Sequence, residues 1–70
     1  MPIVLAPLNK VITIRSVLVE EKTKKHLESL GIAAGREIIV LQISGGNVIV
    51  QVGNSRLALD RSVAMKIFIS

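Results

Sequence analysis

The sequence predicts a mainly β fold: a small barrel of about five short strands, with one short α-helix after the first strand and a helical turn before the last. Two observations support this. Short runs of Ile, Val and Leu are separated by tight-turn residues, and one Glu- and Lys-rich segment has a helical period. The 70 residues suffice for one domain, 1–70. Its core must be thin, because a chain of this size buries only about 60% of its unfolded surface.

The helix is predicted over residues 20–30. Leu27 and Leu30 are three positions apart, so they share one face, which we expect to join the core. No good N-cap residue precedes the segment, whereas Gly31 follows it directly. Glycine tolerates the left-handed conformation that ends a helix, and Ile32 can then fold back onto the last turn.

The first strand is predicted over residues 11–19, where apolar and polar residues alternate and Ser16 marks a bend. The preceding segment, 5–9, reads as a loop that is anchored by Leu5 and Leu8. After the helix, Ala34 and Gly35 suit the centre of a type II turn, because its third residue requires a positive φ.

Four further segments complete the barrel. Gly45-Gly46 predicts a hairpin between strands 36–44 and 48–52, and Gly53-Asn54 predicts a second tight turn into strand 56–59. Asp60 is placed to cap a helical turn over 61–65, and a last strand follows over 66–70. The glycines expected at structural turns are Gly31, Gly35, Gly45, Gly46 and Gly53.

These elements add up to a partly open, SH3-like barrel. Closing the sheet removes most exposed strand edges, which a chain rich in β-branched residues must avoid. The high apolar fraction, 50%, is more than a small core can hide, so an apolar patch for a partner or for self-association is expected.

The motifs resemble those of the FeoA family (ferrous iron transport protein A). The resemblance rests on the unit L-x-x-L-G-I-x-x-G, on the following glycine and valine strand, on an A-L strand and on a late A-x-x-I. These motifs are carried by Leu27 to Ile32 with Gly35, Gly46 with Val48 to Val52, Leu57-Ala58-Leu59, and Ala64 with Ile67. The early glycine usual in the family is missing near Asn9-Lys10.

The resemblance implies an SH3-like domain of iron homeostasis in the cytoplasm, brought to the inner face of the membrane by its partner. That partner is implied to be FeoB, the ferrous iron transporter of the membrane. It also implies kinship with the C-terminal domains of iron-dependent repressors. The family label includes transition metal ion binding.

The residues themselves offer no metal, cofactor or catalytic site. The chain has no cysteine and a single histidine, His26. The positions three and four residues away from it hold no second ligand, since Lys22, Thr23, Ser29 and Leu30 occupy them. The serines lack a base and an orienting group. We therefore expect no enzyme activity.

The net charge of +4 leaves nucleic-acid binding as an alternative function. Single-strand binding usually adds stacking aromatic residues, however, and Phe68 is the one aromatic residue. The same scarcity disfavours an aromatic groove for proline-rich peptides. No apolar run approaches the length of a membrane span, and residues 1–7 lack the basic start of a signal peptide.

Contact with a protein partner is the function we expect. The exposed side of the helix is the first choice for this contact, with two basic residues elsewhere as second choices. The expected contact residues are Lys24, Lys25 and Glu28, followed by Arg56 and Arg61.

Overall fold

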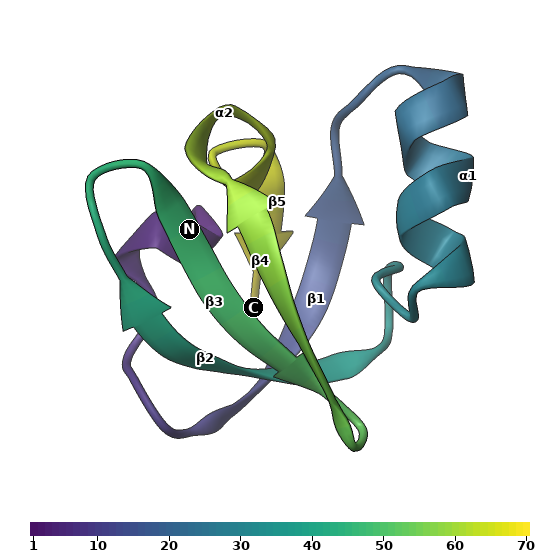
Figure 1. Cartoon of the computed structure of the whole chain (residues 1–70). Coiled ribbons are helices and arrows are strands. Elements are labelled where there is room, and N and C mark those ends of the chain that lie inside the picture. The colour runs from purple at the N-terminus through teal and green to yellow at the C-terminus, as the bar shows by residue number, and fades with distance from the viewer.

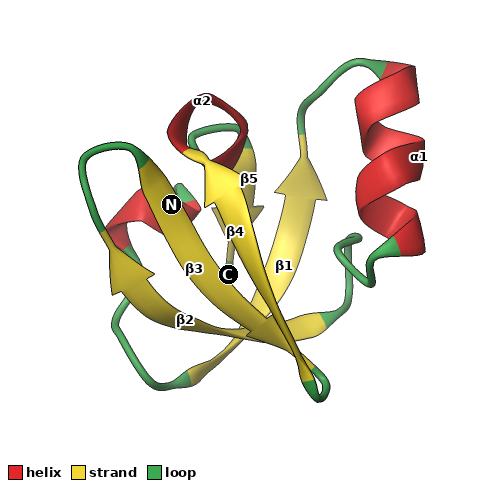
Figure 2. Ribbon diagram, viewed as in Figure 1, coloured by secondary structure: helices red, strands yellow, loops and turns green.

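A computed structural model describes residues 1–70 as one curled antiparallel sheet with two short helices and a 3-10 turn (Figures 1 and 2). The strand order in the sheet is β4-β3-β2-β1-β5. The elements in chain order are η1 (Ile3–Leu5), β1 (Val11–Val17), α1 (Glu21–Ser29), β2 (Glu37–Ile43), β3 (Asn47–Val52), β4 (Ser55–Asp60), α2 (Arg61–Ala64) and β5 (Ile67–Ile69). The predicted element types and their order are confirmed, with boundaries that differ by one or two residues.

The sheet curls into a barrel because β1 pairs with two strands, β2 and β5. Its first half, Val11 to Thr13, pairs with β2, and its second half, from Ile14 to Val17, pairs with β5. The register shifts between Ile14 and Ser16, at the predicted bend. Such a bulge bends a strand and increases its twist. The sheet ends at β4 and β5, which are not hydrogen-bonded neighbours, so the barrel is partly open.

The core consists of 14 buried residues, and all of them are apolar. Val48 and Val50 on β3 are fully buried, as is Val40 on β2, so alternate residues of β3 face the core. No buried side-chain nitrogen or oxygen atom lacks a hydrogen-bond partner. The interior therefore stabilises the fold by apolar packing.

The end of α1 has the geometry of a Schellman motif. Gly31 has a φ of 92°, its N–H donates to the Glu28 carbonyl, and the N–H of Ile32 donates to the Leu27 carbonyl. Leu27 and Ile32 are both buried, which supplies the apolar contact that accompanies this motif. The predicted roles of Gly31 and Ile32 are confirmed.

Two of the other predicted turns also have the expected backbone. The Arg36 N–H donates to the Ala33 carbonyl and Gly35 has a φ of 89°, as a type II turn requires. Gly53 has a φ of 58° at the first position of the β3–β4 turn. Gly45 and Gly46 do join β2 to β3, but neither has a positive φ, so this connection is not a primed turn.

The loop before β1 differs from the prediction. Leu5 and Leu8, the expected anchors, are 67% and 46% exposed, whereas Ile3 and Ala6 are buried. The η1 turn explains this, because it directs Ile3 inward and Leu5 outward. Both pairs have a spacing of three residues, so the sequence alone did not distinguish the inward pair.

Asp60 caps α2 as predicted, and this cap depends on pH. The Ser62 hydroxyl and the Ser62 N–H both donate to its carboxylate, which lowers the pKa of Asp60. A lowered native pKa means that the ionised cap stabilises the fold above the unfolded-state pKa and that this contribution is lost as the pH falls through the native value.

We expect Ser62→Ala to raise the pKa of Asp60 towards its ordinary value. The substitution removes the hydrogen bond from the Ser62 hydroxyl, which lowers this pKa most, and leaves the bond from the Ser62 N–H. An NMR titration of the Asp60 carboxyl carbon measures this shift. Asp60→Asn should flatten the acid side of the plot of melting temperature against pH. An unchanged plot would contradict the assigned role.

Candidate partner-binding surface

The α1 helix stands at one side of the barrel and is attached to it by few residues (Figure 1). Leu27 is its one buried residue and Thr23 is half-buried; the other side chains of the helix are exposed. Glu20 forms no side-chain cap on the helix backbone; its carboxylate instead accepts a bond of 3.2 Å from the Thr23 hydroxyl. A helix that buries one side chain leaves most of its surface open to contact.

The three predicted contact residues on α1 are all on its exposed surface, and Lys25 lies furthest from the buried side. Successive helical residues are rotated by about 100°, so Lys25, two positions before Leu27, points away from the barrel. Lys24 and Glu28 are four residues apart and lie together on one flank. All three are exposed. We call Lys24, Lys25 and Glu28 the α1 surface.

The two second choices do not join the α1 surface. Arg56 lies near the β3–β4 turn and Arg61 lies five residues further, at the start of α2, which corresponds to about 16 Å along an extended strand. The Arg61 side chain donates to the Ser44 carbonyl at 3.5 Å, on the β2–β3 loop. The five predicted contact residues therefore occupy three separate places.

Exposed apolar side chains flank the α1 surface. Leu18 precedes the helix and is exposed, and Leu30, which ends it, is 38% exposed. The prediction that Leu30 joins the core is therefore wrong. Leu30 shares the helical face of Leu27, but α1 ends at Ser29, the chain turns at Gly31, and Ile32 is the next buried residue. Sequence reasoning missed Leu18, which it read as part of a strand.

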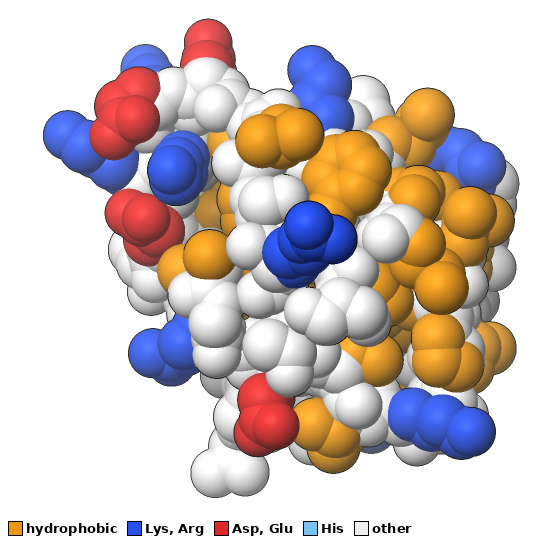
Figure 3. Space-filling view, turned by 180° about the vertical axis from the view of Figure 1, so that it is seen from behind, with side chains coloured by type: hydrophobic (Ala, Val, Ile, Leu, Met, Phe, Trp, Pro, Cys, Tyr) orange, Lys and Arg blue, Asp and Glu red, His pale blue; other side chains and the backbone are white.

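A second apolar region lies on the opposite side of the barrel. Figure 3 shows hydrophobic side chains gathered over η1 and the segment that leads to β1. The large exposed members of this part of the chain are Met1, Leu5, Leu8 and Val11. In the same view, basic and acidic side chains are interspersed over α1, and further basic ones are scattered. The charges thus form no continuous basic face in this view.

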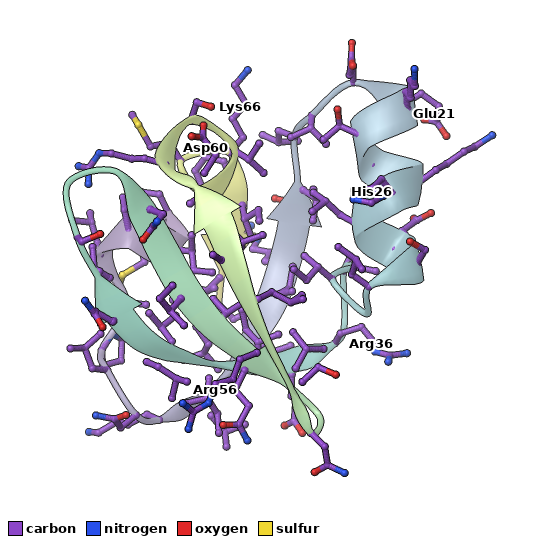
Figure 4. The ribbon with its side chains drawn as sticks, in the orientation of Figure 1. Glu21, His26, Arg36, Arg56, Asp60 and Lys66 are labelled. Carbon is purple, nitrogen blue, oxygen red and sulfur yellow. The ribbon has the colours of Figure 1, made fainter.

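No group of three or more metal-ligating side chains is arranged to hold an ion. His26 is exposed on α1 (Figure 4). The one surface depression, of about 190 Å³, is lined by Val11, Glu37, Ile38, Ile39, Gln51 and Gly53. Typical small-molecule pockets measure about 300–1,000 Å³, so this depression is small for a ligand site.

Comparison with solved structures confirms the SH3-like fold. A crystal structure of an iron uptake regulatory protein (FeoA) superposes with a TM-score of 0.86 at 21% identity, covering 99% of this chain and 93% of that one. FeoA of Stenotrophomonas maltophilia in complex with zinc gives a TM-score of 0.80 at 28% identity, covering 100% and 89%. That protein is described as a prokaryotic SH3-domain protein and a suggested activating factor of ferrous iron transport.

The fold also occurs within a larger protein. ScaR with bound Zn²⁺ gives a TM-score of 0.86 at 17% identity, and this chain covers 36% of it. A comparison with curated proteins gave no match. Neither short helix of this chain has the length and apolar character that a membrane-spanning helix requires.

The fold defines a small SH3-like domain with one short helix exposed at its side. The family profile of the FeoA domain matches residues 1–70, and the chain belongs to this family. The family is associated with ferrous iron transport, which confirms the resemblance inferred from the leucine and glycine motifs.

Proposed function

We propose that this protein is a non-enzymatic accessory factor of ferrous iron uptake that binds the cytoplasmic side of the FeoB transporter. Membership of the FeoA family over residues 1–70 is the observation that carries this proposal. The protein exerts its effect by protein–protein contact, and it requires no cofactor of its own.

The α1 surface supports a role in docking. Its charged side chains, Lys24, Lys25 and Glu28, are flanked by the exposed Leu18 and Leu30 at the two ends of the helix. An apolar contact with a charged rim is the usual composition of a transient interface, in which the charges steer the encounter and set the orientation.

Regulation follows from a difference in affinity between transporter states. A bound protein shifts a conformational equilibrium only to the extent that it binds one conformation more tightly than the other. We therefore expect the affinity for FeoB to differ between its nucleotide-bound and nucleotide-free forms. Equal affinities would leave docking in place and remove regulation by this route.

Reversing the two lysines of the α1 surface tests the docking site. The double variant Lys24→Glu/Lys25→Glu should bind FeoB about tenfold more weakly, mainly through slower association, because rim charges act on the encounter. Lys10→Glu/Arg15→Glu is the matched control, since it changes the net charge equally at residues before and on β1. Surface plasmon resonance gives both rates. Equal weakening by the two variants would show a general charge effect and contradict the assigned surface.

Nucleic-acid binding is the alternative, favoured by the net charge of +4. The salt dependence of binding distinguishes nucleic-acid binding from docking on FeoB. Binding to phosphates weakens steeply with ionic strength, whereas contact through apolar side chains persists. Tight, strongly salt-dependent binding of duplex DNA, together with no binding of FeoB, would favour the alternative.

A further inference from the structure

The β4 strand is an edge of the sheet and has no neighbour on its outer side. It pairs with β3 from Ser55 to Asp60 and is the terminal strand in the sheet order. In Figure 1 it runs along the front of the barrel, and no other segment passes in front of it. An uncovered edge strand offers backbone donors and acceptors to another chain.

The hairpin register shows which backbone groups of β4 face outward. The two-residue turn closes on the pair Val52 and Ser55, and at the other end the Arg61 N–H donates to the Gly46 carbonyl at 3.3 Å. Hydrogen-bonded residues alternate along an antiparallel strand. The odd-numbered residues of β4 therefore bond to β3, and the N–H groups of Arg56, Ala58 and Asp60 point away from the sheet.

The same three residues carry a self-complementary charge pattern. Their side chains lie on the outer face of the barrel and are exposed, with Arg56 near one end of β4 and Asp60 at the other (Figure 4). We propose that β4 pairs antiparallel with β4 of a second copy of this chain, with a two-fold axis at Ala58. Arg56 then lies directly opposite Asp60 of the partner subunit, and the reverse pair forms by symmetry.

Asp60 is able to form this ion pair while it caps α2. Both hydrogen bonds from Ser62 are accepted by the Oδ2 atom of Asp60, so Oδ1 remains for the guanidinium of the partner's Arg56. The pair combines a guanidinium with a carboxylate, which is the most directional charged pair that proteins use.

The charges select this register over its neighbours. A slip of two residues places Arg56 opposite alanine or serine, and a slip of four places arginine opposite arginine or aspartate opposite aspartate. Like charges directly opposite each other destabilise an antiparallel pair. The register centred at Ala58 is the one that sets Arg56 against Asp60 of the partner subunit.

Apolar rows continue across the proposed junction on both faces. On the outer face, Ala58 lies beside the half-buried Ile49 of β3, so the row runs from Ile49 through two alanines to the partner's Ile49. On the inner face, Leu57 is half-buried and lies opposite Leu59 of the partner subunit. Leu59 is already buried, so it is the surface that Leu57 still exposes that pairing removes from water.

Sedimentation velocity from micromolar to millimolar protein tests the proposal. The wild-type protein should pass from monomer to dimer, and Arg56→Asp should weaken the dimer about tenfold or more, because both ion pairs become repulsive. Lys24→Asp on α1 is the matched control and should leave the dimer unchanged. A wild-type protein that stays monomeric, or a dimer that Arg56→Asp leaves intact, would overturn the proposal.

Charge exchange gives a second test. Asp60→Lys alone should also be monomeric, but a mixture of Arg56→Asp and Asp60→Lys chains should form a heterodimer, since each residue then faces an opposite charge.

Amide hydrogen exchange tests the pairing in the wild-type protein, without any substitution. The Ala58 amide should exchange its hydrogen more slowly as the protein concentration rises. The exchange of the Leu57 amide, which is bonded to β3, should not change. Ala58 exchange that is independent of concentration would contradict the pairing.

Discussion

Replacing Gly31 with Val is expected to destabilise the fold strongly. Gly31 has a φ of 92°, and a side chain in such a conformation costs of order 1–3 kcal/mol. A Cβ atom at this position would also lie 2.7 Å from Cγ1 of Val52, and overpacking adds about 1–3 kcal/mol. Valine side chains have little rotational freedom to yield. Urea unfolding measures the loss of stability.

Three alanine variants separate the two causes. Gly31→Ala introduces a Cβ at a positive φ and close to Val52. Gly35→Ala introduces a Cβ at a φ of 89° with no atom within 4 Å, and Gly45→Ala does so without a positive φ or a close neighbour. The loss of unfolding free energy should fall in that order, with Gly45→Ala close to the parent. Equal stability of the Gly31 and Gly45 variants would show that the assigned turn geometry is wrong.

Leu27→Ala should cost about 2–5 kcal/mol, the range found when a buried leucine is truncated. Leu27 is 4% exposed and is the one buried residue of α1, so its side chain holds the helix on the barrel beside Ile32. For a domain whose total stability is about 5–15 kcal/mol, this is a large fraction. The midpoint of urea denaturation should fall accordingly.

Leu30→Ala is the matched control, since it removes the same atoms from the same helix face at a residue that is 38% exposed. It should change the stability by about 0.5 kcal/mol or less. If Leu30→Ala also weakens FeoB binding, the α1 surface extends to the end of the helix. A small cost for Leu27→Ala would contradict its place in the core.

The strands and turns could be predicted because each depends on local signals. Glycines 31, 35 and 53 sit where the backbone requires a positive φ, and the β3 valines alternate as a half-buried strand does. The inward direction of η1 could not be predicted, since Ile3 with Ala6 and Leu5 with Leu8 have the same spacing. Leu30 is exposed although it shares the helical face of Leu27, so its burial depends on tertiary packing and not on helical period alone.

The candidate surface was predictable only in part. Lys24, Lys25 and Glu28 are exposed on one helix as expected, but the sequence did not show that Arg56 and Arg61 lie on other parts of the barrel. The β4 edge was hidden for a different reason. The complementarity of Arg56 and Asp60 becomes visible only when the hairpin register shows that their amides point the same way.

An amide-shift titration tests the proposed docking on FeoB most directly. The isotope-labelled protein is titrated first with the cytoplasmic domain of FeoB from the same cell and then with the whole transporter in detergent, each with and without nucleotide. We predict shifts that centre on α1 and its two ends and that differ between the nucleotide states. Unchanged spectra in every titration of the folded protein would contradict docking on FeoB.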